Sequence, residues 1–185
     1  SQPVRVGNAA SAQAQLDIYG ELADAMSQAI KGGLPRHPRS AAISRLILPY
    51  VERIWREPDE GIWEVRGGRQ QFVHSKVMAW VAFDRAAGLA DTTEEGREHG
   101  QHYRQVADQI RREVCEQGLD SSGSFFVQAY GSHEMDASLL QIALTGFLPA
   151  DDPRFLRTLE QIEQRLLKNG LLMRYDSDSA GDGLT

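Results

Sequence analysis

The sequence is poor in the features that mark secreted, membrane-spanning and nucleic-acid-binding proteins. It contains a single cysteine, Cys115, so no disulfide can form within the chain, and this usage suits a reducing, cytoplasmic compartment. No apolar run approaches the roughly 20 residues that a membrane span needs. The 20 basic side chains are outnumbered by 26 acidic ones and form no cluster, so we expect neither a membrane nor a nucleic acid as partner.

Residue patterns that hold metals or phosphates are also scarce. The five histidines lack the spacing of metal ligands, and the glycine pair at 67–68 lacks the spacing of a phosphate-binding loop. His74, Ser75 and Lys76 are adjacent, and adjacent side chains on a helix point in different directions, which argues against a serine-hydrolase site. We therefore expect no metal and no cofactor.

What the sequence does contain is helical periodicity. The 185 residues are enough for one domain with a sizeable core, and apolar residues recur at three–four spacing almost throughout. This pattern predicts an all-α chain of about six helices, arranged as stacked α-hairpins with the longer connections on one face. The predicted helices cover residues 10–31, 40–56, 71–88, 92–118, 137–146 and 153–168, with Thr92 and Asp152 as N-caps and Asn169-Gly170 as a stop.

The connection between the second and third helices is unusually rich in chemistry. Residues 58–76 combine charged, apolar and glycine positions, and Glu64 directly follows Trp63 and lies two residues before Arg66. A carboxyl group against an indole ring is partly desolvated, which raises its pKa toward that of a general acid at neutral pH. A structural ion pair between Glu64 and Arg66 explains the same residues equally well.

The start of the first predicted helix carries amides and carboxylates on roughly one face. Gln13, Asp17, Gly20 and Glu21 recur at helical spacing, and Gln15 adds another amide. Such groups bind sugar hydroxyls, although they also form ordinary solvated helix faces.

Several long motifs resemble one known family, the glucoamylase-type glycoside hydrolases of family 15. The strongest is Asp-Glu-Gly-Ile-Trp-Glu-Val-Arg-Gly-Gly at 59–68, followed by Phe-Val-His-Ser-Lys-Val-Met-Ala-Trp at 72–80. Gly-Asn-Ala-Ala at 7–10 and Gln-Leu-Asp-Ile-Tyr-Gly-Glu at 15–21 are similar to the motif that precedes it in bacterial members. Shorter matches occur at 130–132, 146–149, 152–154 and 174–175.

The resemblance implies an (α/α)₆ toroid whose active site lies in the funnel formed by the long loops. It implies that residues 1–185 are a single domain and roughly half of that toroid. Glu64 would be the general acid of an inverting α-glucosidase, and the general base would lie beyond residue 185, so the isolated chain is expected to have little activity. Asp59, Glu60, Glu134 and Asp136 could replace the base, but none matches the family position.

The resemblance also suggests which residues contact the substrate. Trp63 and Arg66 would line the subsite of the cleaved sugar, Arg174 would donate to sugar hydroxyls, and Gln15 and Asp17 would lie on a substrate-facing helix. Trehalases, glucoamylases and glucodextranases share these motifs, so an α-glucoside or oligosaccharide is implied without a choice among them.

A rival interpretation is a non-catalytic helical-hairpin module that binds carbohydrate or mediates assembly. A partial toroid leaves the apolar flanks of its end hairpins uncovered, and large apolar patches tend to find partners. Either interpretation therefore predicts a homo-oligomer formed through exposed helical flanks.

Overall fold

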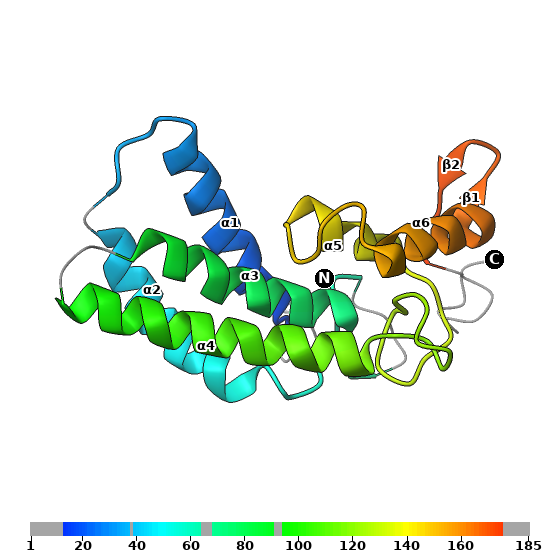
Figure 1. Ribbon diagram of the computed structural model, residues 1–185, viewed down its shortest axis with the longest axis horizontal. Coiled ribbons are helices and arrows are strands. Elements are labelled where there is room, and N and C mark those ends of the chain that lie inside the picture. The colour runs from blue at the N-terminus through cyan, green and yellow to red at the C-terminus, as the bar shows by residue number, and fades with distance from the viewer. Residues whose placement is uncertain (1–12, 38, 64–67, 91–93, 176–185) are drawn as a thin grey trace, which may run out of the picture.

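The structure is a computed structural model that describes residues 13–37, 39–63, 68–90 and 94–175. Helices dominate it, as the sequence predicts, and the strands within the described ranges form one short hairpin (Figure 1). The elements are α1 (Asp17–Lys31), α2 (Arg39–Ile54), α3 (Val73–Leu89), α4 (Glu94–Gln117), the 3₁₀ helix η2 (Ala137–Leu140), α5 (Gln141–Leu144), α6 (Pro153–Leu166), β1 (Leu167–Lys168) and β2 (Leu171–Leu172).

Helix α3 forms the centre of the fold. Most of its side chains are apolar, and every residue from Val73 to Phe83 is buried, including the polar His74, Ser75 and Lys76. Helices α1 and α4 pack along it (Figure 1), and α5 and η2 also contact it. The contact with α1 is close enough that a Cβ on Gly20 would collide with the backbone carbonyl of Met78.

The long connections meet at one end of the helices, as the sequence predicts. The segments that precede α3 and η2 pair with other loops through isolated antiparallel bridges, which join Phe72 to Ala129 and Asp136 to Tyr175. Because these bridges lie directly before the first turns of α3 and η2, the residues of three loops come together over those helix starts.

Three predicted boundaries differ from the structure. Helix α1 begins at Asp17, because the backbone N–H groups of Ala14 and Leu16 donate to carboxylates of a distant loop instead of entering a helix. The fifth helix is a 3₁₀ turn followed by a single α-turn. Asn169 and Gly170, predicted to end a helix, form the turn between β1 and β2, and their φ angles of 54° and 80° suit a type I′ hairpin turn.

Other predictions agree with the structure. Asp152 caps α6 by accepting the N–H of Arg154 at 2.9 Å, and Pro153 occupies its first turn. Thr92, the predicted cap of α4, lies outside the described residues.

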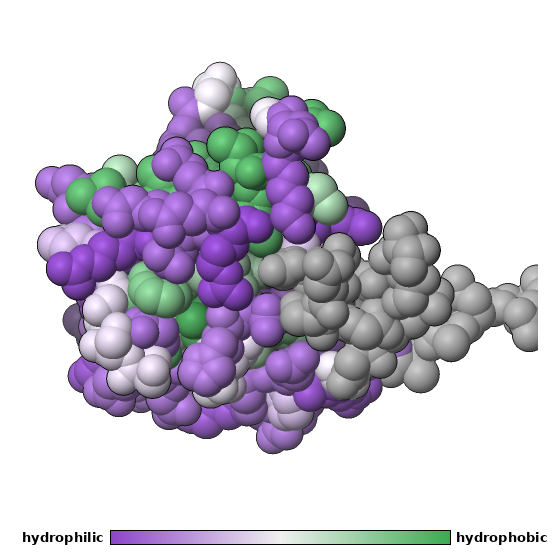
Figure 2. Space-filling view, turned by 90° about the vertical axis from the view of Figure 1, so that its right-hand side faces the viewer, coloured by the Kyte–Doolittle hydropathy of each residue, from purple (hydrophilic) through white to green (hydrophobic). Residues whose placement is uncertain are grey.

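The end of the molecule that carries α6 and the β1–β2 hairpin has a mixed surface. Hydrophobic areas alternate there with hydrophilic ones (Figure 2). The exposed large apolar side chains of these elements are Leu156, Leu167, Leu171 and Leu172. None of the helices in the described ranges is both long enough and apolar enough to cross a membrane.

Candidate active site

Trp63 lies at the meeting point of the three loops. Its indole Nε1–H donates to Oδ1 of Asp136 at 2.9 Å, across 73 positions of sequence. The carboxylate of Asp136 is buried and accepts two further hydrogen bonds, from the backbone N–H of Ser138 at 2.8 Å and from Nε2 of Gln128 at 3.1 Å. The polar edge of the indole is therefore held by the start of η2 and by the loop that precedes it.

The guanidinium of Arg174 lies over the face of the same indole ring. The guanidinium carbon lies 5.5 Å from the centre of the Trp63 ring and 5.8 Å from that of Tyr175, within the range of cation–π attraction. The backbone of Arg174 is held in turn, because its carbonyl accepts the N–H of Ala137 at 2.8 Å. The structure thus brings together Trp63 and Arg174, two of the residues predicted to contact substrate.

Beneath Trp63 lies a small cavity of about 10 Å³, lined by Gly61, Ile62, Trp63, Phe72, His74, Gln128, Asp136 and Ser138. His74 is almost fully buried, and neither of its ring nitrogens has a hydrogen-bond partner in the part of the chain that the structure describes. Burial lowers the pKa of His74 to about 4, although the nearby Asp136 opposes the change. His74 is therefore a neutral imidazole at physiological pH.

The loop that carries Glu64 is closed at its base. Asp59 and Gln70 exchange two backbone hydrogen bonds of 3.0 Å, and Nε of Arg69 donates to Glu60 at 2.9 Å. Glu64 and Arg66 lie outside the described residues, so the choice between an ion pair and a general acid stays a matter of prediction. Trp63 is the last described residue before Glu64.

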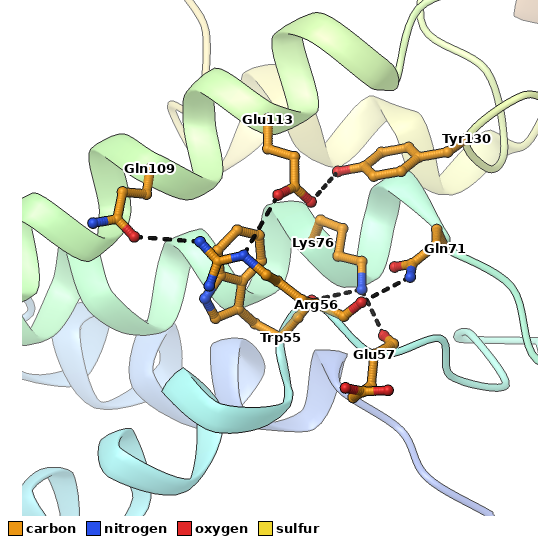
Figure 3. Close-up of polar contacts among 8 residues, drawn as sticks. All are labelled: Trp55, Arg56, Glu57, Gln71, Lys76, Gln109, Glu113 and Tyr130. Atoms are coloured by element: carbon orange, nitrogen blue, oxygen red, sulfur yellow. Dashed lines mark hydrogen bonds and ion pairs between the residues drawn. The ribbon is translucent and has the colours of Figure 1, made fainter.

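A buried cation anchors the chain where it leaves α2 and enters this loop (Figure 3). The Lys76 ammonium is fully buried and donates to the carbonyls of Trp55 at 2.6 Å and Glu57 at 2.7 Å. Burial lowers the pKa of Lys76 to about 8, against the attraction of nearby carboxylates. In the same cluster Nε2 of Gln71 donates to the carbonyl of Arg56 at 2.7 Å. Lys76 therefore has a structural role.

Gln15 and Asp17 form a second group, next to the first turn of α1. Gln15 lies in the non-helical segment that precedes α1, so its predicted place on a helix is wrong. It lines a pocket of about 400 Å³ together with Gln13, Tyr19, Tyr50, Glu57, Asp59 and Arg69, among others. Amide, aromatic and charged groups that converge on one pocket can bind a polar ligand.

Asp17 is buried at the start of α1, and its Oδ1 has no hydrogen-bond partner among the residues described. Burial raises the pKa of Asp17 to about 6, and the negative charge of Asp59 contributes to the increase. Asp59 is buried as well and accepts hydrogen bonds from the Leu16 N–H at 3.0 Å and the Ser75 hydroxyl at 2.8 Å. Two buried carboxyl groups therefore lie near each other where α1 meets the loop.

The four carboxylates considered as replacement bases all have structural partners. Asp59, Glu60 and Asp136 make the contacts given above, and Glu134 lies 3.7 Å from the guanidinium of Arg165. In addition, the described ranges hold no group of three or more histidine, cysteine, aspartate or glutamate side chains placed to bind a metal ion.

The arrangement of helices is that of known glycosidases. A solved wild-type glycosidase superposes with a TM-score of 0.79 at 22% identity, over 94% of this chain and 46% of that one. A glycosidase variant in complex with glucose superposes with a TM-score of 0.77 at the same identity and coverage.

The sequence places the chain more closely: it belongs to the Glycosyl hydrolases family 15, whose profile matches residues 1–185. The trehalase of Mycobacterium tuberculosis is 42% identical over all of this chain and 27% of its own length. The trehalase of Thermoplasma volcanium is 40% identical over all of this chain and 29% of its own length. The chain thus spans under a third of these relatives, and the resemblance noted in the sequence is confirmed.

Sequence reasoning missed two partners in the site. Asp136 was considered only as a base, and Gln128 was not considered. Their link to Trp63 depends on a loop that returns to the site after the whole of α3 and α4, and no spacing rule connects positions so far apart. The one local signal was Asp136 itself, which lies directly before Ala137 and the helix predicted there.

Proposed function

We propose that the chain forms the acid-bearing part of an inverting α-glucosidase that acts on trehalose or a related α-glucoside. The observation that carries the proposal is the fixed indole of Trp63, held at its edge by Asp136 and at its face by Arg174, directly before Glu64. Aromatic rings beside cationic and amide groups suit a sugar, which offers both apolar faces and hydroxyl groups. The named trehalases among the relatives favour trehalose.

In the proposed reaction Glu64 protonates the glycosidic oxygen as the bond to the anomeric carbon breaks. Inversion requires a second carboxylate, roughly 6.5–9.5 Å away, to activate a water on the opposite face of the sugar. Asp59, Glu60, Glu134 and Asp136 are engaged in structural contacts, and we place the base outside the 185 residues. Arg174 and Arg66 would hold the hydroxyls of the cleaved sugar, and Gln15 and Asp17 would contribute from the start of α1.

The same proposal makes residues 1–185 one domain that corresponds to roughly half of an (α/α)₆ toroid. The coverage of 46% on the solved glycosidase supports this fraction. The alternation of buried α3 with the outer helix α4 supports the layered arrangement of such a toroid.

The test uses azide as a small external nucleophile with the 185-residue chain and trehalose. If Glu64 is the acid and the base is absent, azide should attack the anomeric carbon while Glu64 protonates the departing glucose, giving β-glucosyl azide. Glu64→Gln should lower this rate by ~10²–10⁴-fold, while the matched variant Glu160→Gln, at an exposed position of α6, should not change it.

Three outcomes would overturn part of this proposal. Fast hydrolysis of trehalose in water alone would contradict the absent base, and α-glucosyl azide would contradict inversion. Sugar binding with no azide product would favour the carbohydrate-binding module instead.

We also propose that the chain self-associates through the flank of α1 and α2. Several large apolar side chains are exposed there, namely Ile18, Leu22, Ile43, Leu46 and Tyr50. Sedimentation velocity should show a dimer or larger species, which Leu46→Glu, at a site 79% exposed, should shift toward monomer. A monomer at all concentrations would contradict self-association without affecting the proposed chemistry.

A further inference from the structure

Asp136 makes more contacts than a helix cap requires. It lies in extended conformation just before η2, with φ −143° and ψ 131°, and its acceptance of the Ser138 N–H is ordinary capping. The same carboxylate also accepts the indole N–H of Trp63 and the side-chain amide of Gln128. Of these additional donors, Trp63 comes from another loop and Gln128 from an earlier part of the same loop, so one buried side chain ties two loops to the start of η2.

The N-cap of α6, Asp152, shows which of these contacts capping by itself requires. Asp152 caps α6 in the same way, accepting the N–H of Arg154 at 2.9 Å, and its carboxylate also accepts hydrogen bonds from the Arg154 side chain. Capping alone therefore uses only local donors. Asp136 differs, because it caps η2 and also accepts a long-range hydrogen bond from Trp63.

The geometry around Trp63 shows what that bond controls. An indole can rotate about its two side-chain torsions, and a hydrogen bond at Nε1 restrains that rotation from the edge of the ring. Arg174 restrains the ring from its face, and the Arg174 carbonyl is held by Ala137, the residue next to Asp136. Both restraints on the indole thus depend on the backbone and side chain at 136–137.

We propose that Asp136 is a positioning residue that sets the orientation of Trp63, and through Trp63 the sugar-binding surface beside Glu64. The inference rests on the proposed function for its effect on sugar binding, but not for its effect on the indole.

The test uses substitutions that separate capping from positioning. Asp136→Ser keeps a good N-cap, but its hydroxyl is too short to reach the indole. Asp136→Asn keeps Oδ1 as an acceptor and serves as the conservative rescue. Asp152→Ser is the matched control, because it alters a cap that does not touch Trp63.

The direct readout is the indole ¹⁵N–¹H spectrum of the 185-residue chain. The chain has three tryptophans, so three indole signals are expected, and Trp63→Phe identifies the one from Trp63. Asp136→Ser should move that signal toward the position of a water-exposed indole, whereas Asp136→Asn and Asp152→Ser should leave it close to its original position. An unmoved signal in Asp136→Ser would overturn the proposal.

The second readout is the dissociation constant for trehalose, measured by calorimetry. Asp136→Ser should weaken binding roughly tenfold, the effect of one well-formed hydrogen bond, and by less than twofold when Trp63 is already phenylalanine. Equal losses in both backgrounds would mean that Asp136 does not act through Trp63.

If the unmodified chain does not bind trehalose, the proposed substrate is wrong. The indole signal then decides the positioning role by itself.

Discussion

The buried carboxyl group of Asp17 should destabilise the folded chain at neutral pH. Its folded-state pKa of about 6 lies above the ordinary value of 3.8, so the folded chain keeps a proton that the unfolded chain releases between these values. The free energy of unfolding is therefore not lowered by this group below pH 3.8. It falls as the pH rises from 3.8 to 6, and the loss is complete above about pH 6. At about 1.36 kcal/mol per pH unit, the loss at pH 7.5 is about 3 kcal/mol.

Asp17→Asn should remove most of this loss, because the amide carries no charge and needs no proton. We expect the variant to be more stable than the parent by about 1–3 kcal/mol at pH 7.5, the lower limit allowing for the burial cost of the amide. At pH 4.5 the gain should fall by about two-thirds, since that pH lies only about 0.7 unit above the unfolded pKa, out of the roughly 2.2 units that separate the two pKa values. Urea unfolding at both pH values measures the difference.

The control is Asp108→Asn, at an exposed position of α4, which should show little change at either pH. A less stable Asp17→Asn variant at pH 7.5, or a gain that does not depend on pH, would refute the reasoning. If Asp17 binds sugar, the same variant should bind trehalose more weakly, which is the usual cost of relieving strain at a functional site.

Two further substitutions test the packing around α3. Gly20→Ala should destabilise the chain by about 2–4 kcal/mol in urea unfolding, because the new methyl group meets the Met78 carbonyl. Gly88→Ala is the control and should be neutral or slightly stabilising, because there is open space around Gly88. Lys76→Met should cost about 2–4 kcal/mol at pH 7, because two buried carbonyls lose their donor. The cost of Lys76→Met should grow between pH 8 and 10, because the folded chain releases the Lys76 proton near pH 8 while the unfolded chain keeps it. Equal costs at pH 8 and at pH 10 would contradict that pKa.

Local patterns in the sequence predicted most of the helices. The three–four spacing placed α2, α3, α4 and α6 within a few residues, and Asp152-Pro153 marked the start of α6, because periodicity and capping depend on neighbouring residues. The start of α1 was placed too early, since the carboxylates that capture the N–H groups of Ala14 and Leu16 come from residues 59 and 60. Asn169-Gly170 can end a helix or form a hairpin turn, and the dipeptide alone does not distinguish them.

The site was predictable in part. The family resemblance indicated Trp63 and Arg174, and the structure brings their side chains together. It did not indicate that Asp136 holds the indole, because that contact is created by the return of a loop after two long helices. The burial of Asp17 was also invisible, since a carboxylate at the start of a helix is usually exposed to solvent.

The almost continuous burial of α3 determines how the chain can be divided. A helix whose buried apolar side chains point in every direction cannot persist in water by itself, so α3 needs both α1 and α4 as covers, and no single hairpin of this fold can be an independent unit. The segments around η2 and α5 belong to the same core, since Leu139, Ile142 and Phe147 are buried in one cluster with the residues of α3. A protease that cuts there would therefore disturb the core, and it would also separate Asp136 and Arg174 from each other or from Trp63.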